Sequence, residues 1–265
     1  LYLFTFSFLL GTIKYSNFIY SYSMKKELII KLSVTISLVA MFVVNALANI
    51  LPINGITTGA LSDAIPIYFV PAGYAFSIWG LIYAGLVVYI ISMFTNFTKE
   101  DKAIYPWVIT SSLANIAWIF LWHYRLIYLS VIAMVIILAS LIAIFLILNK
   151  SKKVSIFKTL PFDIYLGWIS VASIANIAAA LYIANWNGFG ISPEVWSAIM
   201  IIIATGLAVY SILKKRYAYS LVILWAIIGI LVKFSGLSNP VEIASTLGIL
   251  TITSVIGFKL YLDNK

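Results

Sequence analysis

The chain has 265 residues, of which 63% are hydrophobic and only 9% are charged, and its mean hydropathy is +1.09. Soluble globular domains of this size do not reach such values, so the composition identifies a polytopic membrane protein. Cysteine is absent, which excludes disulfides, thiolate metal sites and thiol nucleophiles. The formal net charge of +9 would suggest nucleic-acid binding in a soluble protein, but in a membrane protein basic residues mostly report topology.

Residues 1–28 form an N-terminal extension that we expect not to be part of the fold. Its apolar run ends before Lys14 and is shorter than a membrane span requires. Met24 and the two lysines after it have the form of a natural start. A signal peptide is the competing interpretation, although no small-residue cleavage site follows the apolar run.

Eight apolar segments follow, each near the roughly 20 residues that a membrane-spanning helix needs. Their apolar runs are continuous rather than alternating, which favours helices over strands. The sequence therefore predicts an all-α polytopic membrane protein with eight spans. These are expected at about 29–51, 74–95, 104–123, 127–149, 160–183, 193–213, 217–235 and 242–262.

The basic residues predict how these spans are oriented. All lysines and arginines except Arg125 and Lys233 fall in the N-terminal segment, the even-numbered loops or the C-terminal segment. Under the positive-inside rule, this distribution places both termini in the cytoplasm of a multi-pass plasma-membrane protein. The positive charge is thus explained by topology, and no nucleic-acid partner is expected. The first external loop, 52–70, is polar and contains no lysine or arginine, so it is either a lid or a simple connection.

The most informative stretch is 71–83, which reads PAGYAFSIWGLIY. Its proline is expected in the first turn of the second span, where the missing amide would have no partner anyway. Tyr74 precedes three aromatic residues, Phe76, Trp79 and Tyr83, whose spacing places them on one helical face. We interpret this face as the wall of a ligand pocket; the alternative is an ordinary interfacial aromatic belt.

Polar residues inside the other spans are candidates for the same pocket, because polar groups in a membrane cost free energy unless they are partnered. Under the predicted topology, they lie in the outer parts of their spans and converge with the aromatic stretch, which favours a cavity that opens outward. The alternative is that these amides only pack helices together, in which case they could lie at unrelated depths. Trp168 lies about 12 Å deeper than Asn176, at 1.5 Å per residue along the fifth span. The members of this set are Asn45 and Asn49 in the first span, Asn115 and Trp118 in the third, and Trp168 and Asn176 in the fifth.

These residues resemble the TspO/MBR family, the tryptophan-rich sensory or translocator proteins. The family's Pro-Pro-Gly-Trp-x-Phe segment with its following Trp and Tyr is similar to the stretch at 71–83. Its Asn-x-x-Trp helix resembles Asn115 and Trp118, and its Trp-x-x-x-Ala-Thr-x-x-Asn helix resembles a third motif. The residues of that third motif are Trp168, Ala172, Ser173 and Asn176.

The chain departs from the family pattern at several points. Ala72 replaces the second proline, and Tyr74 replaces a tryptophan. The segment between Phe76 and Trp79 is one residue shorter and lacks the family's Gly-Pro, and Pro161 lies farther ahead of the third motif. No convincing cholesterol-recognition pattern follows the fifth span, so sterol binding is not carried over.

The resemblance covers 29–183 as a five-helix bundle and leaves 184–265 as three further membrane helices of unknown role. It implies a small-molecule-binding protein of the sensor or transporter type, whose pocket for tetrapyrroles or other flat apolar ligands is closed by the first loop. No cofactor is required, and porphyrin or haem is expected as a ligand only. The expected partners are the lipid bilayer and a hydrophobic small molecule, a tetrapyrrole or a lipid, and homodimer formation stays open.

Two other functions remain open from the residues alone. A membrane enzyme acting on a lipid, isoprenoid or tetrapyrrole would depend on Asp163 or Asn115, and the scarcity of ionisable groups counts against it. A scaffold would use the additional helices to hold a partner. The single histidine, His123, is interpreted as part of an interfacial belt, with an axial haem ligand as the alternative.

Overall fold

The computed structural model describes residues 2–151 and 154–264, with side chains from residue 24 onward, and the described chain is helical without strands. Its α-helices are α1 (Tyr2–Ile50), α2 (Thr58–Asp63), α3 (Ile78–Thr95), α4 (Lys99–His123), α5 (Ile127–Lys150), α6 (Ile156–Ile183), α7 (Pro193–Leu213), α8 (Tyr217–Phe234) and α9 (Asn239–Asp263). Short 3-10 turns lie at Ile53–Gly55, Gly73–Ser77 and Gly188–Gly190.

Eight of the described helical segments are long and apolar enough to cross a membrane, so the predicted all-α polytopic fold is confirmed. The limits of α7 agree with the predicted 193–213. α4 begins five residues before the predicted 104, because Thr98 and Asp101 form a capping box. In this motif the Thr98 side chain accepts from the Asp101 amide, while the Asp101 side chain accepts from the Thr98 amide.

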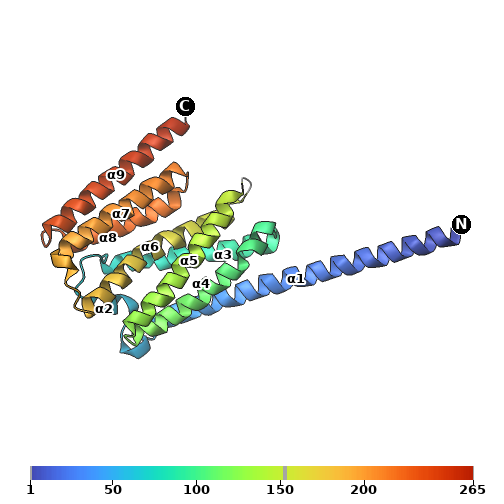
Figure 1. Ribbon diagram of the computed structural model, residues 1–265, viewed down its shortest axis with the longest axis horizontal. Helices are drawn as coiled ribbons and strands as arrows, with labels where there is room; N and C mark the ends of the chain where they lie inside the picture. The colour runs from blue at the N-terminus through green and yellow to red at the C-terminus, as the bar shows by residue number, and fades with distance from the viewer. Residues whose placement is uncertain (1, 152–153, 265) are drawn as a thin grey trace.

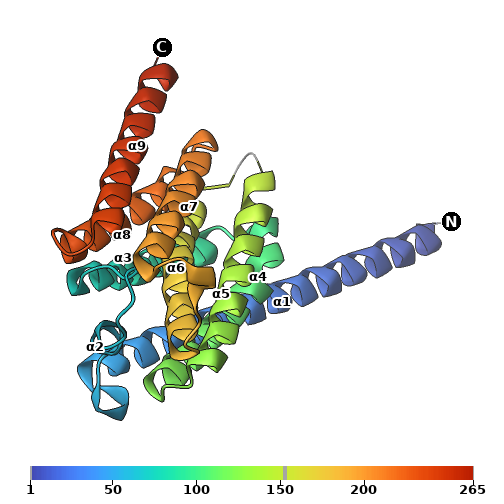
Figure 2. The ribbon, with the colours of Figure 1, turned by 60° about the vertical axis from the view of Figure 1, so that its left-hand side comes forward.

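Helix α1 is continuous from Tyr2 to Ile50, so the boundary expected at residue 28 is not marked by a break in the helix. Its N-terminal part extends away from the rest of the molecule as a single rod (Figures 1 and 2). Among the described side chains of α1, burial begins at Ile30 and continues with Val34, Leu38 and Met41. The spacing of three and four residues places this set on the one face of α1 that packs against α3 and α4.

The helices form two groups that meet along α6 and α8. In the first group, α1 packs on α4, α4 on α5, α5 on α6 and α6 on α3, and the contact of α3 with α1 closes a ring of five helices. In the second group, α7, α8 and α9 pack on one another. Figures 1 and 2 show this second group, in orange and red, lying along one side of the five-helix ring.

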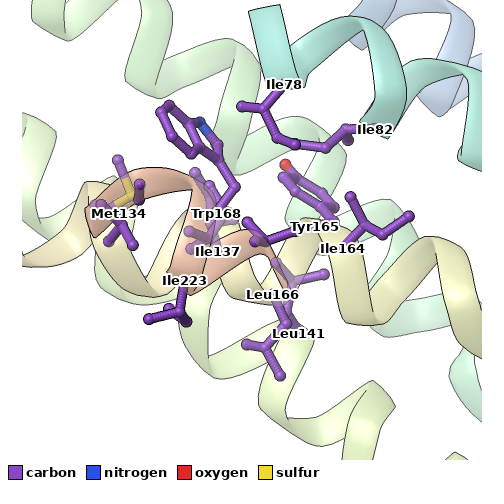
Figure 3. Close-up of a cluster of buried hydrophobic side chains, with 14 of the residues drawn as sticks. Ile78, Ile82, Met134, Ile137, Leu141, Ile164, Tyr165, Leu166, Trp168 and Ile223 are labelled. Atoms are coloured by element: carbon purple, nitrogen blue, oxygen red, sulfur yellow. The ribbon is translucent and has the colours of Figure 1, made fainter. Parts of the chain in front are cut away.

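Helix α6 lies between the two groups and is the most buried of the candidate spans. Figure 3 shows its Tyr165 and Trp168 in one cluster with Ile82 of α3 and Ile223 of α8. Gly167 permits the close approach of α8, because a Cβ at this position would lie 2.9 Å from the Cβ of Val222. Helix α8 is therefore packed directly against the core of the five-helix ring, whereas α7 and α9 pack mainly on α8 and on each other.

Buried ion pairs join the helices at the end of the bundle where α4, α6 and α8 begin. Lys158 of α6 pairs with Asp101 of α4, and both side chains are almost fully buried. Arg216, at the start of α8, pairs with Asp163 of α6 at 2.5 Å. We call this end, defined by these two pairs, the ion-paired end. Its buried charges are partnered, as they must be in a low-dielectric environment.

Candidate functional site

The opposite end of the bundle carries the loop 51–72, and His123 fastens this loop to the end of α4. The imidazole Nδ1 lies 3.0 Å from the Ile53 carbonyl oxygen, and Nε2 lies 2.9 Å from the Thr58 hydroxyl. Because a carbonyl oxygen can only accept, Nδ1 donates to Ile53, and in the neutral ring Nε2 then accepts from the Thr58 hydroxyl. Asn54 adds a third bond by donating to the His123 carbonyl oxygen at 3.1 Å.

This arrangement corrects the interpretation of His123 as a member of an interfacial belt. Its side chain is fully buried, with 0% of its surface exposed. Both ring nitrogens are already engaged by the loop, so the ring is not free to serve as an axial haem ligand in this conformation. Its role here is to hold Thr58, the first residue of α2, in place.

The segment 71–77 leads from this loop into α3 and lies against α8. The Ala72 amide donates to the Gly229 carbonyl oxygen at 3.0 Å, a bond that a proline at position 72 could not make. Trp225 Nε1 donates to the Ala75 carbonyl oxygen, also at 3.0 Å. A Cβ at Gly229 would lie 2.8 Å from the Cβ of Pro71, so this contact requires glycine.

The same contacts correct two expectations about 71–83. Gly73–Ser77 is a 3-10 turn and α3 begins only at Ile78, so Pro71 precedes the helix rather than opening its first turn. Tyr74 turns away from the other aromatic residues and packs edge-on against Trp225, with the ring centroids 5.3 Å apart. Its side chain lines neither of the cavities described below.

Next to the loop lies a cavity of about 550 Å³, which we call the loop-side cavity. Trp79 and Tyr83 form a stacked pair on its α3 wall, with centroids 5.7 Å apart. Asp63 also lines it, and its carboxylate is paired with Lys233 of α8 at 2.5 Å. The complete wall consists of Asn45, Ala46, Asn49, Ile50, Thr57, Thr58, Gly59, Ala60, Asp63, Gly73, Phe76, Trp79, Tyr83 and Ile119.

A much smaller space of about 40 Å³ lies beyond Thr58, Phe76 and Trp79, which line both cavities; we call it the inner cavity. Phe76 packs edge-on against Trp168, with centroids 5.5 Å apart and an interplanar angle of 80°. The inner cavity is lined further by Ser62, Ile65, Ile67, Val70, Pro71, Trp118, Trp122, Trp168, Val171, Ala172, Ala175 and Asn176.

One hydrogen-bond network connects α4, α5 and α6 behind the inner cavity. Trp118 Nε1 donates to Asn176 Oδ1 at 3.0 Å, and Asn176 Nδ2 donates to Ser130 at 2.9 Å. Trp118 also stacks on Trp122, with the ring centroids 5.8 Å apart and an interplanar angle of 18°. These bonds fix the orientation of the indole and of the amide that together form the deepest wall of the site.

A second amide contact joins α1 and α4. Asn45 Nδ2 donates to Asn115 Oδ1 at 2.6 Å and to the Met41 carbonyl oxygen at 2.8 Å. Asn115 is fully buried and lines neither of the two cavities, so in this structure it packs helices together. Asn49 Nδ2 donates to the Asn45 carbonyl oxygen at 3.0 Å, and both Asn45 and Asn49 line the loop-side cavity.

The structure thus brings most of the sequence-derived set together at one end of the bundle. All of its members except Tyr74 and Asn115 line the loop-side cavity, the inner cavity or both. That they bind a ligand stays a prediction. Sequence reasoning missed Trp122, Ser130 and Thr58. Trp122 could have been found from its spacing of four residues after Trp118, whereas Ser130 and Thr58 carry no comparable pattern.

The fold and these cavities define a multi-pass helical membrane protein whose first loop and helices α1, α3, α4 and α6 surround an aromatic space. The chain matches the model of the TSPO-like protein family over residues 31–258 and therefore belongs to this family. No curated protein and no solved structure matches it. The family match begins in α1 and ends in α9, so it includes the C-terminal helices as well as the five-helix ring.

Proposed function

We propose that this chain is a membrane small-molecule-binding protein of the sensor or transporter type, and that its ligand occupies the loop-side cavity. The observation that carries the proposal is the size and wall of this cavity. Its volume of about 550 Å³ lies within the roughly 300–1,000 Å³ of ordinary ligand sites. Its wall combines the rings of Phe76, Trp79 and Tyr83 with the amides of Asn45 and Asn49.

A flat apolar ligand such as a tetrapyrrole suits this wall best. The stacked pair of Trp79 and Tyr83 offers a broad aromatic surface, and the amides offer neutral hydrogen-bond donors and acceptors. The inner cavity, at about 40 Å³, has no room for an additional ring. We therefore assign ring binding to the loop-side cavity, and entry into the inner cavity would require Phe76 and Trp79 to move.

The enzyme alternative receives no support from the position of its candidate residues. Asp163 is paired with Arg216 at the ion-paired end and lines neither cavity. Asn115 is hydrogen-bonded to Asn45 between α1 and α4. Within the described residues, no group of three or more His, Cys, Asp or Glu side chains is placed to hold a metal ion. We propose no second function for these cavities.

The proposal is tested by titrating the purified protein with protoporphyrin and following the absorbance of the pigment. Trp79→Leu removes the central ring of the wall, and we expect an affinity at least about tenfold lower, in line with the large share of binding energy carried by buried tryptophans. Trp107→Leu is the matched control, because Trp107 lies on α4, is 41% exposed and lines neither cavity. Equal affinities of the two variants would refute the assignment.

A further inference from the structure

A third cavity lies outside this site, between the C-terminal half of α6 and the N-terminal half of α7. Its volume is about 520 Å³, and we call it the α6–α7 cavity. α7 packs mainly on α8 and α9 and makes few contacts with α6, which leaves the space between them. Among the lining residues are Ile174, Ile177, Ala178, Trp196 and Met200.

The walls of this cavity are apolar along the helices, whereas the polar groups gather at one end. From Ile174 to Tyr182, α6 provides a wall about 12 Å long at 1.5 Å per residue. The polar end includes Tyr182, Asn185 and Trp186, which lie where α6 ends and the loop to α7 begins. Their side-chain polar atoms have no hydrogen-bond partner among the described residues, so they are available to a ligand.

The rim at this end is held in a defined shape. Trp196 Nε1 donates to the Gly188 carbonyl oxygen at 2.9 Å, and Gly188 has a positive φ of 64° that favours glycine. On the loop 51–72, Tyr68 lies beside Glu194, the second residue of α7. The interaction with this carboxylate, followed by burial, raises the pKa of Tyr68 above its ordinary value, so the hydroxyl keeps its proton.

The charges of the cavity lining determine which kind of polar head group a ligand in this cavity can carry. The lining contains no lysine, arginine or histidine, so an anionic head group would find no partner. The carboxylate of Glu194 beside the rim would repel it further. A neutral head with a hydroxyl or ester group can instead bond with Tyr182, Asn185 and Trp186, while its chain lies along α6 and α7.

We propose that the α6–α7 cavity binds a neutral single-chain amphiphile from the bilayer, such as a long-chain or isoprenoid alcohol, with its head at Asn185 and its chain between α6 and α7. The volume fits one chain, since it lies in the range of small-ligand sites. This site shares no lining residue with the loop-side cavity. A test of ligand binding in the α6–α7 cavity therefore does not depend on whether a ligand binds in the loop-side cavity.

The test uses hexadecanol that carries a diazirine on its chain as a photoreactive probe, with the corresponding fatty acid as the anionic comparison. The full-length protein in nanodiscs is labelled, and the labelled peptides are mapped by mass spectrometry. We expect the alcohol to label 174–200 saturably, and the acid to need a concentration at least about tenfold higher. Labelling that does not saturate, or equal labelling by alcohol and acid, would overturn the proposal, because ordinary boundary lipid behaves in this way.

Two variants separate this site from the rest of the lipid-facing surface. Ala178→Phe fills the cavity and is expected to weaken labelling by about tenfold or more. Ala198→Phe is the matched control, since Ala198 is also half-buried, lies on α7 and does not line the cavity. Equal labelling of both variants would contradict the proposal.

Asn185→Gly provides a second test that does not depend on packing. Asn185 has a positive φ of 52°, which glycine adopts without strain, and its side chain is exposed, so this variant should fold. It is expected to weaken labelling by the alcohol about threefold, because one hydrogen-bonding group for the head is lost. Unchanged labelling of this variant would rule out Asn185 as the head-group site.

Discussion

The two ends of the helix bundle are held together by different chemistry. At the ion-paired end, Lys158 with Asp101 and Arg216 with Asp163 form buried charge pairs between helices. At the loop end, the segments are joined by ring contacts such as Phe76 with Trp168 and by neutral hydrogen bonds such as Trp118 with Asn176. Among the described residues, the ion pair at the loop end is that of Lys233 with Asp63, and both of its side chains are partly exposed.

This difference explains why the three cavities described above lie at the loop end. A buried charge pair tolerates little change in geometry, because separating its members exposes each to a large desolvation cost. Rings and amides can shift or exchange partners at smaller cost, so a wall made of them can admit a ligand. We therefore expect changes at the ion-paired end to alter stability, and changes at the loop end to alter the loop and ligand binding.

The largest effect is expected for Arg216→Met, which leaves Asp163 buried without its partner and removes the contact of the guanidinium with the Phe145 ring. Breaking a buried pair in this way costs about 3–5 kcal/mol of unfolding free energy. Thermal unfolding in detergent measures the loss. Lys215→Met is the matched control, because its pair with Asp263 is exposed and should contribute nothing measurable. A similar loss of thermal stability in both variants would contradict the expectation that the buried pair stabilises the fold more than the exposed pair.

A smaller effect is expected where α8 meets the segment 71–77. In Gly229→Ala, the added methyl group would lie 2.8 Å from Pro71 Cβ and 3.1 Å from Ala75 Cβ, and such overpacking costs about 1–3 kcal/mol. Gly206→Ala is the control, since no atom lies within 4 Å of its added Cβ and alanine favours the helix. If both variants unfold at the same temperature, α8 does not hold this segment as tightly as the contacts indicate.

The smallest effect on stability is expected for His123→Phe, which releases the loop. The loss of the bonds to Ile53 and Thr58 should speed amide hydrogen exchange in 53–63 by about tenfold, because each such bond contributes about 0.5–1.5 kcal/mol. Tyr124→Phe, at an exposed neighbouring position, serves as the control and should leave exchange unchanged. Unchanged exchange in both variants would show that other contacts hold the loop.

The membrane helices could be predicted from sequence because hydropathy over about 20 residues is a local property. The polar residues that line the cavities were found for a similar reason, since an amide such as Asn176 inside an apolar span stands out without any knowledge of its partners. The same reasoning selected Asn115, which instead packs helices, because spacing along a helix does not reveal which neighbour an amide faces.

The remaining features depend on contacts between distant parts of the chain. Tyr74 is turned away from the cavity by Trp225, which lies about 150 residues later in the sequence. The replacement of a family proline by Ala72 is explained only once Gly229 is known to accept its amide. His123 could not be recognised as a loop anchor, because neither Ile53 nor Thr58 has a pattern that identifies it as a histidine partner.

A single-cysteine variant measures whether a ligand occupies the loop-side cavity. The chain has no native cysteine, so Ala60→Cys, in the wall of this cavity, is its only thiol. Leu237→Cys, on the loop between α8 and α9, is the control because its side chain is 75% exposed and lines no part of the cavity. Both variants are alkylated with a water-soluble maleimide, with and without protoporphyrin.

A bound ligand buries most of its own surface against the wall, so saturating protoporphyrin should slow alkylation of Ala60→Cys by roughly fivefold or more. Alkylation of Leu237→Cys should keep its rate. Equal rates with and without protoporphyrin at Ala60→Cys, or equal slowing of both variants, would contradict the assignment of the loop-side cavity as the ligand site.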